Sequence, residues 1–424
     1  MQPFTTLTQK HFEHRLMDNG LPVYVLRKPG FNKKYAVFAT RYGSLDSEFA
    51  VAGKGVIKVP DGIAHFLEHK LFEEEDEHVF ERFAKYGASV NAFTSYNMTA
   101  YLFSTIDHFP EALTELMHFV QNPYLTEANV TKERGIIEQE LRMYDDNPDR
   151  RIYRNLLQAL YHHHPIRLDV GGTVESIQEI TVDLLMECYR LFYQPRNMVL
   201  FVVGDVDAAQ VFDLVEHQNK LWRYQEQEIQ RIEPDEPETV AQERIEDQLS
   251  ISRPRYYLGF KDRPRGEGKE LLKQYFIMNM IWSSIAAKSS PIFEKLYNVG
   301  LIDDSFGASF QSSPRYAFSV VGGETDDPNK LDAALREEIS KLQQTKIQSI
   351  DIERMKRRTL GNYYAAFNSL DCLANSFIGH LFNGTNFFDI PEVVQSITVA
   401  DVNQYLTDGL QFSYSAVSIL MPEE

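Results

Sequence analysis

The segment "GIAHFLEHKLF", Gly62 to Phe72, places two histidines four residues apart, with a glutamate directly before the second. On an α-helix, residues three and four apart share a face, so His65, Glu68 and His69 would present two imidazoles and a carboxylate together. Two such imidazoles can bind one tetrahedral cation, and the carboxylate can accept a proton from water activated by that cation. The order is that of the inverted His-x-x-Glu-His zinc motif, and it predicts a hydrolytic zinc site.

The motif alone does not decide the matter. A His-x-x-acidic-His pattern arises in a chain of this composition with a probability of roughly 0.05. The alternative is a solvated helix face on which a glutamate pairs with a histidine. A third ligand elsewhere in the chain would favour the metal, because a catalytic zinc usually has three protein ligands and a water.

The third ligand is expected in "TEANVTKERGIIEQELRMYDD", residues 126–146, which has a helical pattern that begins with a threonine able to cap it. One stripe of this helix comprises Glu133, Ile136, Ile137, Glu140, Met143 and Tyr144. Two carboxylates on an apolar stripe would cost several kcal/mol if buried unpaired, and a cation would remove that cost. We therefore predict that Glu140 is a zinc ligand and that Glu133 supports the site. The alternative is a pair of surface glutamates on an amphipathic helix.

The remaining elements form a recognisable frame for these two helices. Residues 21–30 and 35–44 read as short strands, and "NMVLFVVGDV", residues 197–206, reads as a buried strand. Residues 89–105, "SVNAFTSYNMTAYLFST", predict two β segments around a polar turn. Helical patterns dominate between residues 109 and 192.

The chain also contains signs of a duplication. "SIQEITVDL" at residue 176 matches "VVQSITVAD" at residue 393, and the Glu133-Arg134 pair recurs as Glu353-Arg354, with offsets of 217 and 220 residues. The second copy has no histidine pair in place of "HFLEH", so we assign the chemistry to the first. We predict an N-terminal catalytic domain (1–224), a linker rich in Glu, Gln and Pro (225–247) and a homologous non-catalytic domain (248–424).

Length and composition limit the class of protein. The 424 residues, 43% of them hydrophobic, suit two globular domains. A formal charge of −18 disfavours binding to nucleic acid or to an anionic membrane. Cys188 and Cys372 are too few for a disulfide framework. Without an apolar run of signal-peptide or membrane-spanning length, we expect a cytoplasmic protein.

The spacing of the motif from the two glutamates resembles that of the pitrilysin/insulinase metallopeptidases, which include the mitochondrial processing peptidases. Further segments are similar to the same family: "EHKLFEE", "SVNAFTSYNMTAYLF", "HHPIRLDVGG" and "NMVLFVVGDVD". The resemblance implies an α+β fold of two homologous domains, each an antiparallel sheet covered by helices. One such pair is half of the clam-shell peptidase, so a dimer is implied.

The resemblance also implies roles for individual residues. His65, His69 and Glu140 would bind one Zn²⁺ per chain, Glu68 would be the general base, and Glu133 would match a supporting carboxylate of the catalytic centre. The sheet edge formed by Asn91, Ala92, Phe93 and Thr94 would bind the peptide substrate as an added strand. The implied activity is that of a zinc endopeptidase acting on small unfolded peptides or peptide precursors.

One departure from the family bears on the partner. Many relatives carry an Arg and a Tyr seven residues apart in the C-terminal domain, and the matching region here, residues 293–310, has no arginine and so lacks that pair. We therefore expect the chain to work with a paralogous partner that supplies the pair, with a homodimer as the other possibility. The alternative function is a non-catalytic or partner-dependent, peptide-binding subunit of a processing peptidase.

Overall fold

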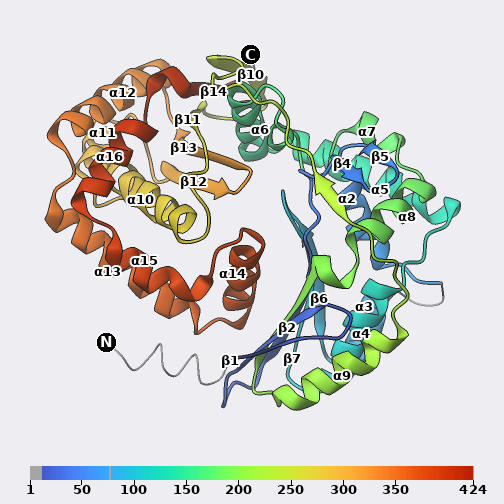
Figure 1. The fold of residues 1–424 in the computed structure, drawn as a ribbon. Coiled ribbons are helices and arrows are strands. Elements are labelled where there is room, and N and C mark those ends of the chain that lie inside the picture. Colours follow the sequence, from blue (N-terminus) through green and yellow to red (C-terminus); the bar gives the residue numbers. More distant parts are fainter. Residues whose placement is uncertain (1–11, 76–77, 424) are drawn as a thin grey trace. The chain divides into compact units, whose positions relative to one another are not determined.

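The computed structural model describes residues 12–75 and 78–423 (Figure 1). These residues form two compact units. The first, called here the N-terminal unit, contains the residues up to 141 together with 169–232 and 366–382. The second, the C-terminal unit, contains residues 142–168, 233–365 and 383–424.

The N-terminal unit is built on a six-stranded sheet in the order β1-β2-β8-β3-β7-β6. The strands are β1 (Phe12–Leu16), β2 (Pro22–Arg27), β3 (Lys34–Thr40), β6 (Ser89–Thr94), β7 (Thr99–Thr105) and β8 (Met198–Gly204). All neighbours are antiparallel except β2 and β8, which are parallel. Among the strands of the described residues, β6 pairs only with β7, so it forms one edge of this sheet.

Both faces of this sheet are covered. Leu200 and Val202 of β8 belong to the main core, whereas Phe201 between them lies on the opposite face and contacts Phe377. This is the period-two alternation of a strand buried on both sides. Besides α6, described below, the helices from the first half of the chain are α2 (Ile63–Leu71), α3 (Val79–Lys85), α4 (Phe109–Gln121), α5 (Glu127–Asp145), α7 (Val174–Gln178), α8 (Val182–Phe192) and α9 (Ala208–Leu221).

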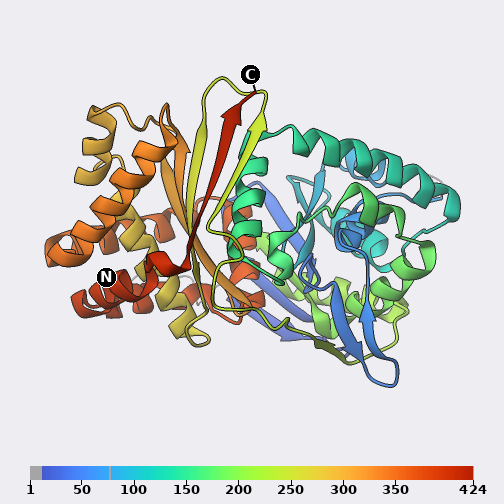
Figure 2. The same ribbon diagram turned by 90° about the horizontal axis from the view of Figure 1, so that it is seen from above.

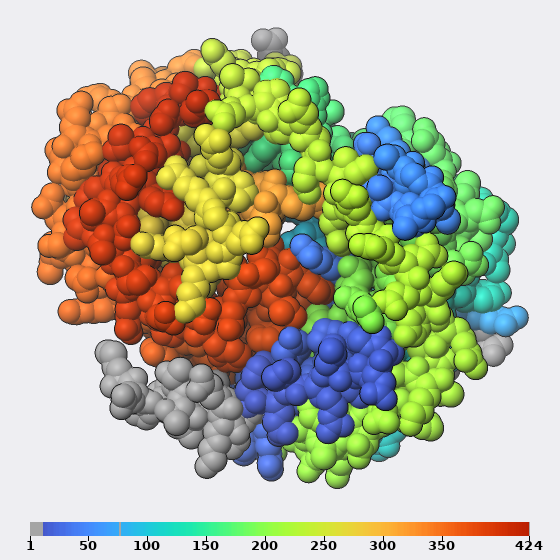
Figure 3. All heavy atoms as spheres, viewed as in Figure 1, coloured from blue at the N-terminus to red at the C-terminus, as the bar shows by residue number. Residues whose placement is uncertain are grey.

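A small second sheet lies at the surface of the N-terminal unit. β4 (Glu48–Val51) pairs with both β5 (Gly55–Lys58) and β9 (Ile229–Arg231). The β4–β5 hairpin, blue in Figure 3, carries the exposed side chain of Val56. We expected residues 225–247 to be a linker, but residues 229–231 of that segment form β9 and pair with β4.

The C-terminal unit repeats the same sheet. Its order is β10-β14-β11-β13-β12, and only the β10–β14 pair is parallel. The strands are β10 (Arg244–Leu249), β11 (Arg255–Asp262), β12 (Gly307–Ser313), β13 (Tyr316–Glu324) and β14 (Ser415–Pro422). Figure 2 shows β14, in dark red, between β10 and β11. Five strands thus recur in the order and sense of β2-β8-β3-β7-β6, which supports the duplication.

The helices of the second half also follow the order of the first. They are α10 (Lys269–Ala286), α11 (Pro291–Asn298), α12 (Pro328–Thr345), α13 (Ser349–Ala366), α14 (Leu370–Phe382), α15 (Ile390–Ser396) and α16 (Val399–Gly409). The expected α+β fold of two homologous domains is confirmed. The parallel pair in each sheet is the one feature that the expectation of antiparallel sheets did not include.

The compact units are not the contiguous halves expected from the sequence. α6 (Pro148–Leu160) follows α5 in the first half but packs on β11 and β14, and α14 from the second half packs on β3 and β8. Gly259 of β11 allows the close approach of α6, since a Cβ atom there would lie 2.9 Å from a methyl group of Leu160. Each sheet is therefore covered by a helix from the other half. β9 and the first four residues of β10, 244–247, lie within the predicted linker.

Among the described residues, no helix combines the length and apolarity needed to cross a bilayer. The opening residues 1–11, on which part of the expectation about a signal peptide depended, lie outside the described part of the chain.

Candidate metal centre

The start of α2 is fixed by a tight turn. Gly62 precedes the helix with a φ of 85°, a left-handed conformation that favours glycine. A Cβ atom at Gly62 would also lie 2.1 Å from the carbonyl oxygen of Gly171. Ile63, Phe66 and Leu67 are buried in the core of the N-terminal unit. The helix is thereby oriented with His65 and His69 on its other side, toward α5.

α5 begins with the expected cap. Thr126 and Asn129 exchange hydrogen bonds, each side chain accepting from the other's backbone N–H. The helix buries Glu133 and Ile137 as predicted, but Ile136 is 44% exposed and Met143 is 61% exposed. Those two positions were wrongly placed on the core-facing stripe. The buried stripe is narrower and runs through positions 130, 133, 137 and 141, so Ile136 points to solvent.

The two helices bring the predicted ligands together. Nε2 of His65 lies 3.9 Å from Oε1 of Glu140, and Nε2 of His69 lies 3.6 Å from Oε2 of Glu140. The three potential ligand atoms all lie within 4.8 Å of one another. Ligand atoms around a tetrahedral zinc with bonds of about 2.1 Å are separated by about 3.4 Å. Two imidazoles and one carboxylate are also a donor set typical of catalytic zinc, so these residues fit the ion.

Glu133 contacts this cluster through the Nδ1 side of His69, opposite the Nε2 atom that faces Glu140. Its Oε1 atom lies 3.1 Å from Nδ1 of His69, and a carboxylate there accepts a hydrogen bond from Nδ1–H and leaves Nε2 with its lone pair. Its Oε2 atom lies 3.4 Å from the ammonium nitrogen of Lys70. Burial alone would raise the pKa of Glu133, but the hydrogen bond with His69 and the charge of Lys70 bring that pKa below its ordinary value.

Glu68 lies on the same side of α2 and is 8% exposed. The hydroxyl of Thr94 donates a hydrogen bond of 2.6 Å to its Oε2 atom. Burial raises the pKa of Glu68 and the Glu140 carboxylate adds to this, while the Thr94 bond and His69 oppose it. A carboxylate with a raised pKa is a stronger proton acceptor than an exposed one, which suits a general base.

The residues predicted to bind substrate form the last four positions of the edge strand β6. Asn91 is exposed, and Ala92, Phe93 and Thr94 are half-buried. Of the four, Thr94 contacts the predicted base directly, a role that the sequence did not suggest. Lys70 was also missed, although it is fully buried. The signal that the sequence offers for it is its place directly after the second histidine of the motif.

Replacing Thr94 by valine should lower kcat for peptide cleavage about 10-fold with zinc content unchanged. The change removes one charge-assisted hydrogen bond from Glu68 while keeping the side chain's volume, and such a bond contributes about 1.5 kcal/mol. Steady-state kinetics and metal analysis of T94V check this. T114V, on the exposed face of α4, is the matched control. An unchanged kcat in T94V would contradict the role given to the hydroxyl.

A second cluster in the N-terminal unit has a different explanation. Glu74, Glu115 and His118 lie close enough together to hold a metal. However, Arg82 forms ion pairs with both Glu74 and Glu115. A guanidinium group between the two carboxylates satisfies their charge, so this cluster is an ion-pair network and not a site for a cation.

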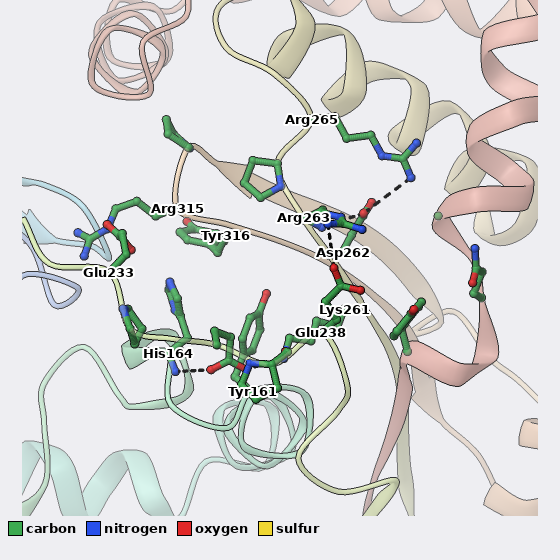
Figure 4. Close-up of a pocket in the computed structure, with 18 of the residues that line it drawn as sticks. Tyr161, His164, Glu233, Glu238, Lys261, Asp262, Arg263, Arg265, Arg315 and Tyr316 are labelled. Carbon is green, nitrogen blue, oxygen red and sulfur yellow. Dashed lines mark hydrogen bonds and ion pairs between the residues drawn. The ribbon is translucent and has the colours of Figure 1, made fainter.

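A cavity of about 660 Å³ lies in the C-terminal unit, and its lining contains none of the predicted metal ligands (Figure 4). Its cations are all paired with acidic residues: Lys261 with Glu236, Arg263 with Glu238, Arg265 with Asp262 and Arg315 with Glu233. Three of those acids come from residues 233–238. These ion pairs therefore attach residues 233–238, which follow β9, to the rest of the C-terminal unit.

Glu236 is the centre of that attachment. Its carboxylate accepts the backbone N–H groups of residues 162, 163 and 164 and the ammonium of Lys261. Burial opposes ionisation, but these donors lower the pKa of Glu236 from 4.5 to about 2. Because the folded-state pKa is depressed, the resulting stability is complete above about pH 4.5 and is lost as the pH falls toward 2.

Glu236→Gln should therefore destabilise the protein by about 2–3 kcal/mol at pH 7. Gln cannot provide the charge and turns an N–H group toward other donors. Urea unfolding of both proteins at pH 7 and pH 3 measures the difference, which should shrink at the lower pH. A difference that stays constant with pH would show that the ionised carboxylate is not the stabilising group.

Comparison with known proteins agrees with the geometry. Residues 58–174 match the family model described as insulinase (peptidase family M16), and residues 179–359 match the one described as peptidase M16 inactive domain. The chain is 43% identical over 418 residues to the uncharacterized zinc protease YmfH of Bacillus subtilis (strain 168), covering 98% of this chain and 97% of that protein. It is 25% identical over 356 residues to the zinc protease PqqE of Helicobacter pylori (strain ATCC 700392 / 26695), covering 80% and 78%.

Solved structures show the same relationship. An M16-like peptidase from Alicyclobacillus acidocaldarius superimposes with a TM-score of 0.94 at 36% identity, covering 97% of this chain and 99% of that one. Pitrilysin shares the fold with a TM-score of 0.75 at 16% identity, and the match covers 97% of this chain but 45% of pitrilysin. With these similarities over nearly its whole length, the chain belongs to the insulinase family of peptidases, peptidase family M16.

Proposed function

We propose that this protein is a zinc-dependent endopeptidase in which His65, His69 and Glu140 bind one zinc ion and Glu68 is the general base. The observation that carries the proposal is the convergence of Glu140 on both imidazoles from a separate helix, within 4.8 Å. The names of the relatives, zinc proteases in two of the cases given above, support it.

The residues of the chain divide the chemistry between them. Zinc held by the two histidines and Glu140 would supply Lewis-acid catalysis. Glu68 accepts the proton of the attacking water and passes it to the leaving amine. Glu133 keeps the His69 ring in one orientation and one tautomer.

The edge strand β6 is the proposed binding site for the peptide. A strand paired on one side only can pair with an extended peptide through its backbone groups, although the N–H of Ala92 donates to Oδ1 of Asn91 and would have to exchange that bond for one to the peptide. The last residue of this strand, Thr94, contacts Glu68, so a peptide along β6 would run beside the base. Pairing through the main chain reads conformation more than sequence, and we therefore propose unfolded peptides or peptide precursors as substrates.

Removal of the metal tests the proposal. Dialysis against a strong chelator should abolish cleavage of an unstructured peptide, and one equivalent of zinc should restore it, because no other group in the cluster provides Lewis-acid catalysis. Mass spectrometry of the products measures cleavage and also identifies internal cutting. A metal-free protein that cleaves at the original rate would refute the proposal.

We also propose a paralogous partner chain. The region of α11 and β12 has no arginine, so it lacks the Arg and Tyr pair expected there from the family resemblance. A partner that supplies them would raise activity, whereas a chain used only to bind peptides would stay inactive with or without it. Light scattering and peptide cleavage on the purified chain check this. Full activity as a homodimer would contradict the need for a paralogue.

A further inference from the structure

Lys70 directly follows the second histidine of the motif and is fully buried. Its neighbours along α2, Ile63, Phe66, Leu67 and Leu71, are apolar and belong to the core. An apolar residue would suit such a position, because a buried ammonium group costs several kcal/mol unless it is paired. The presence of a lysine therefore needs an explanation other than packing.

The ammonium group of Lys70 has three partners, and two of them come from α5. It donates to the backbone carbonyl of Asn129 at 3.3 Å and to Oε2 of Glu133 at 3.4 Å. It also forms an ion pair with Glu73 at the end of its own helix. Lys70 thus joins the helix that carries the histidines to the helix that carries Glu140.

Glu133 uses its two oxygens for two different groups. Oε1 accepts from His69 at 3.1 Å, and Oε2 faces Lys70. A carboxylate held at both oxygens cannot rotate freely, so its orientation toward Nδ1 of His69 is fixed. Groups that orient a metal-binding histidine in this way typically raise metal affinity 10–100-fold.

We propose that Lys70 is a positioning residue of the zinc site, which acts through Glu133 on the ring of His69. This inference rests on the proposed function, since it assumes that His69 binds zinc. It assigns Lys70 a role in metal affinity in addition to any role in stability.

Lys70→Met tests the proposal, because methionine has a similar length and no charge. The zinc dissociation constant, measured by competition with a chromophoric chelator, should rise about 10–100-fold. Lys132→Met is the matched control, since Lys132 is exposed and also approaches Glu73, at 3.8 Å, without reaching Glu133. K132M should bind zinc as the wild type does. The visible spectrum of the cobalt(II) form should change in K70M and not in K132M.

The same measurements separate the possible failures. If the wild type binds no zinc that depends on His65, His69 and Glu140, the proposed function fails. If the wild type binds zinc and K70M binds it equally well, only the role of Lys70 is refuted. In the double variant K70M/E133Q, the loss should be no greater than in E133Q alone, because both act through one connection. Additive losses would overturn that connection.

A second variant separates the two carboxylate partners of Lys70. Glu73→Gln leaves the core side chain in place and frees the ammonium group from its other carboxylate. E73Q should therefore bind zinc as tightly as the wild type or up to a few-fold more tightly. A loss in E73Q equal to that in K70M would show that the pairing with Glu73, and not that with Glu133, matters for the metal.

Discussion

Glu68→Gln is expected to lower kcat for peptide cleavage about 10³-fold while the protein keeps its zinc. The glutamine amide cannot accept a proton from water, and loss of a general base typically costs 10²–10⁴-fold. Its carbonyl oxygen can still accept the hydrogen bond from Thr94, so the side chain keeps its place. Single-turnover cleavage of a fluorogenic peptide, together with metal analysis, measures both properties.

The control for this experiment is Glu81→Gln, which makes the same chemical change on the exposed face of α3. E81Q should cleave and bind zinc normally. If E68Q cleaves at the wild-type rate, another group must accept the proton. If E68Q instead loses its zinc, the residue supports the metal site, and the assignment as general base is wrong.

Much of the frame of this site could be predicted from the sequence because its signals are local. The cap and helical period of residues 126–146 and the two strands around residues 95–98 depend on nearby residues. The duplication was visible as a repeated pattern and reappears as two sheets with the same strand order. Local patterns of this kind can be recognised without any knowledge of the tertiary structure.

The features that were missed depend on contacts between distant segments. Nothing in the sequence of α6 distinguishes the sheet on which it packs; the structure shows it by the contacts of α6 with β11 and β14 and by the close approach at Gly259. A lysine reads as a surface residue, yet Lys70 is buried because acidic and carbonyl groups of α5 surround its charge. Ile136 was predicted to be buried because its spacing from Glu133 and Glu140 fits one helix face. The packing of α5 buries a narrower face, which does not include Ile136.

Glu140→Gln is expected to have the largest effect on the metal itself, since it removes the charged ligand of the three. We expect the zinc dissociation constant to rise at least about 100-fold. Zinc at 100 times the wild-type dissociation constant stabilises the wild type by about 2.7 kcal/mol, whereas E140Q, with a constant 100-fold higher, gains about 0.4 kcal/mol. Because a chain of 424 residues has an unfolding entropy of about 0.9 kcal/mol/K, thermal unfolding with and without zinc should show a shift in Tm of about 3 °C for the wild type and about 0.5 °C for E140Q.

The matched control is Glu138→Gln, on another face of the same helix, which lies near Gln178 and not near the histidines. E138Q should show the wild-type shift. The metal-free forms of E140Q and the wild type should unfold at similar temperatures at a pH where both imidazoles are neutral, because without the ion the Glu140 carboxylate favours only the protonated form of His69, whose pKa it helps to raise. A full zinc-dependent shift in E140Q would mean that the third ligand is another residue, and the link between α2 and α5 through a shared ion would no longer hold.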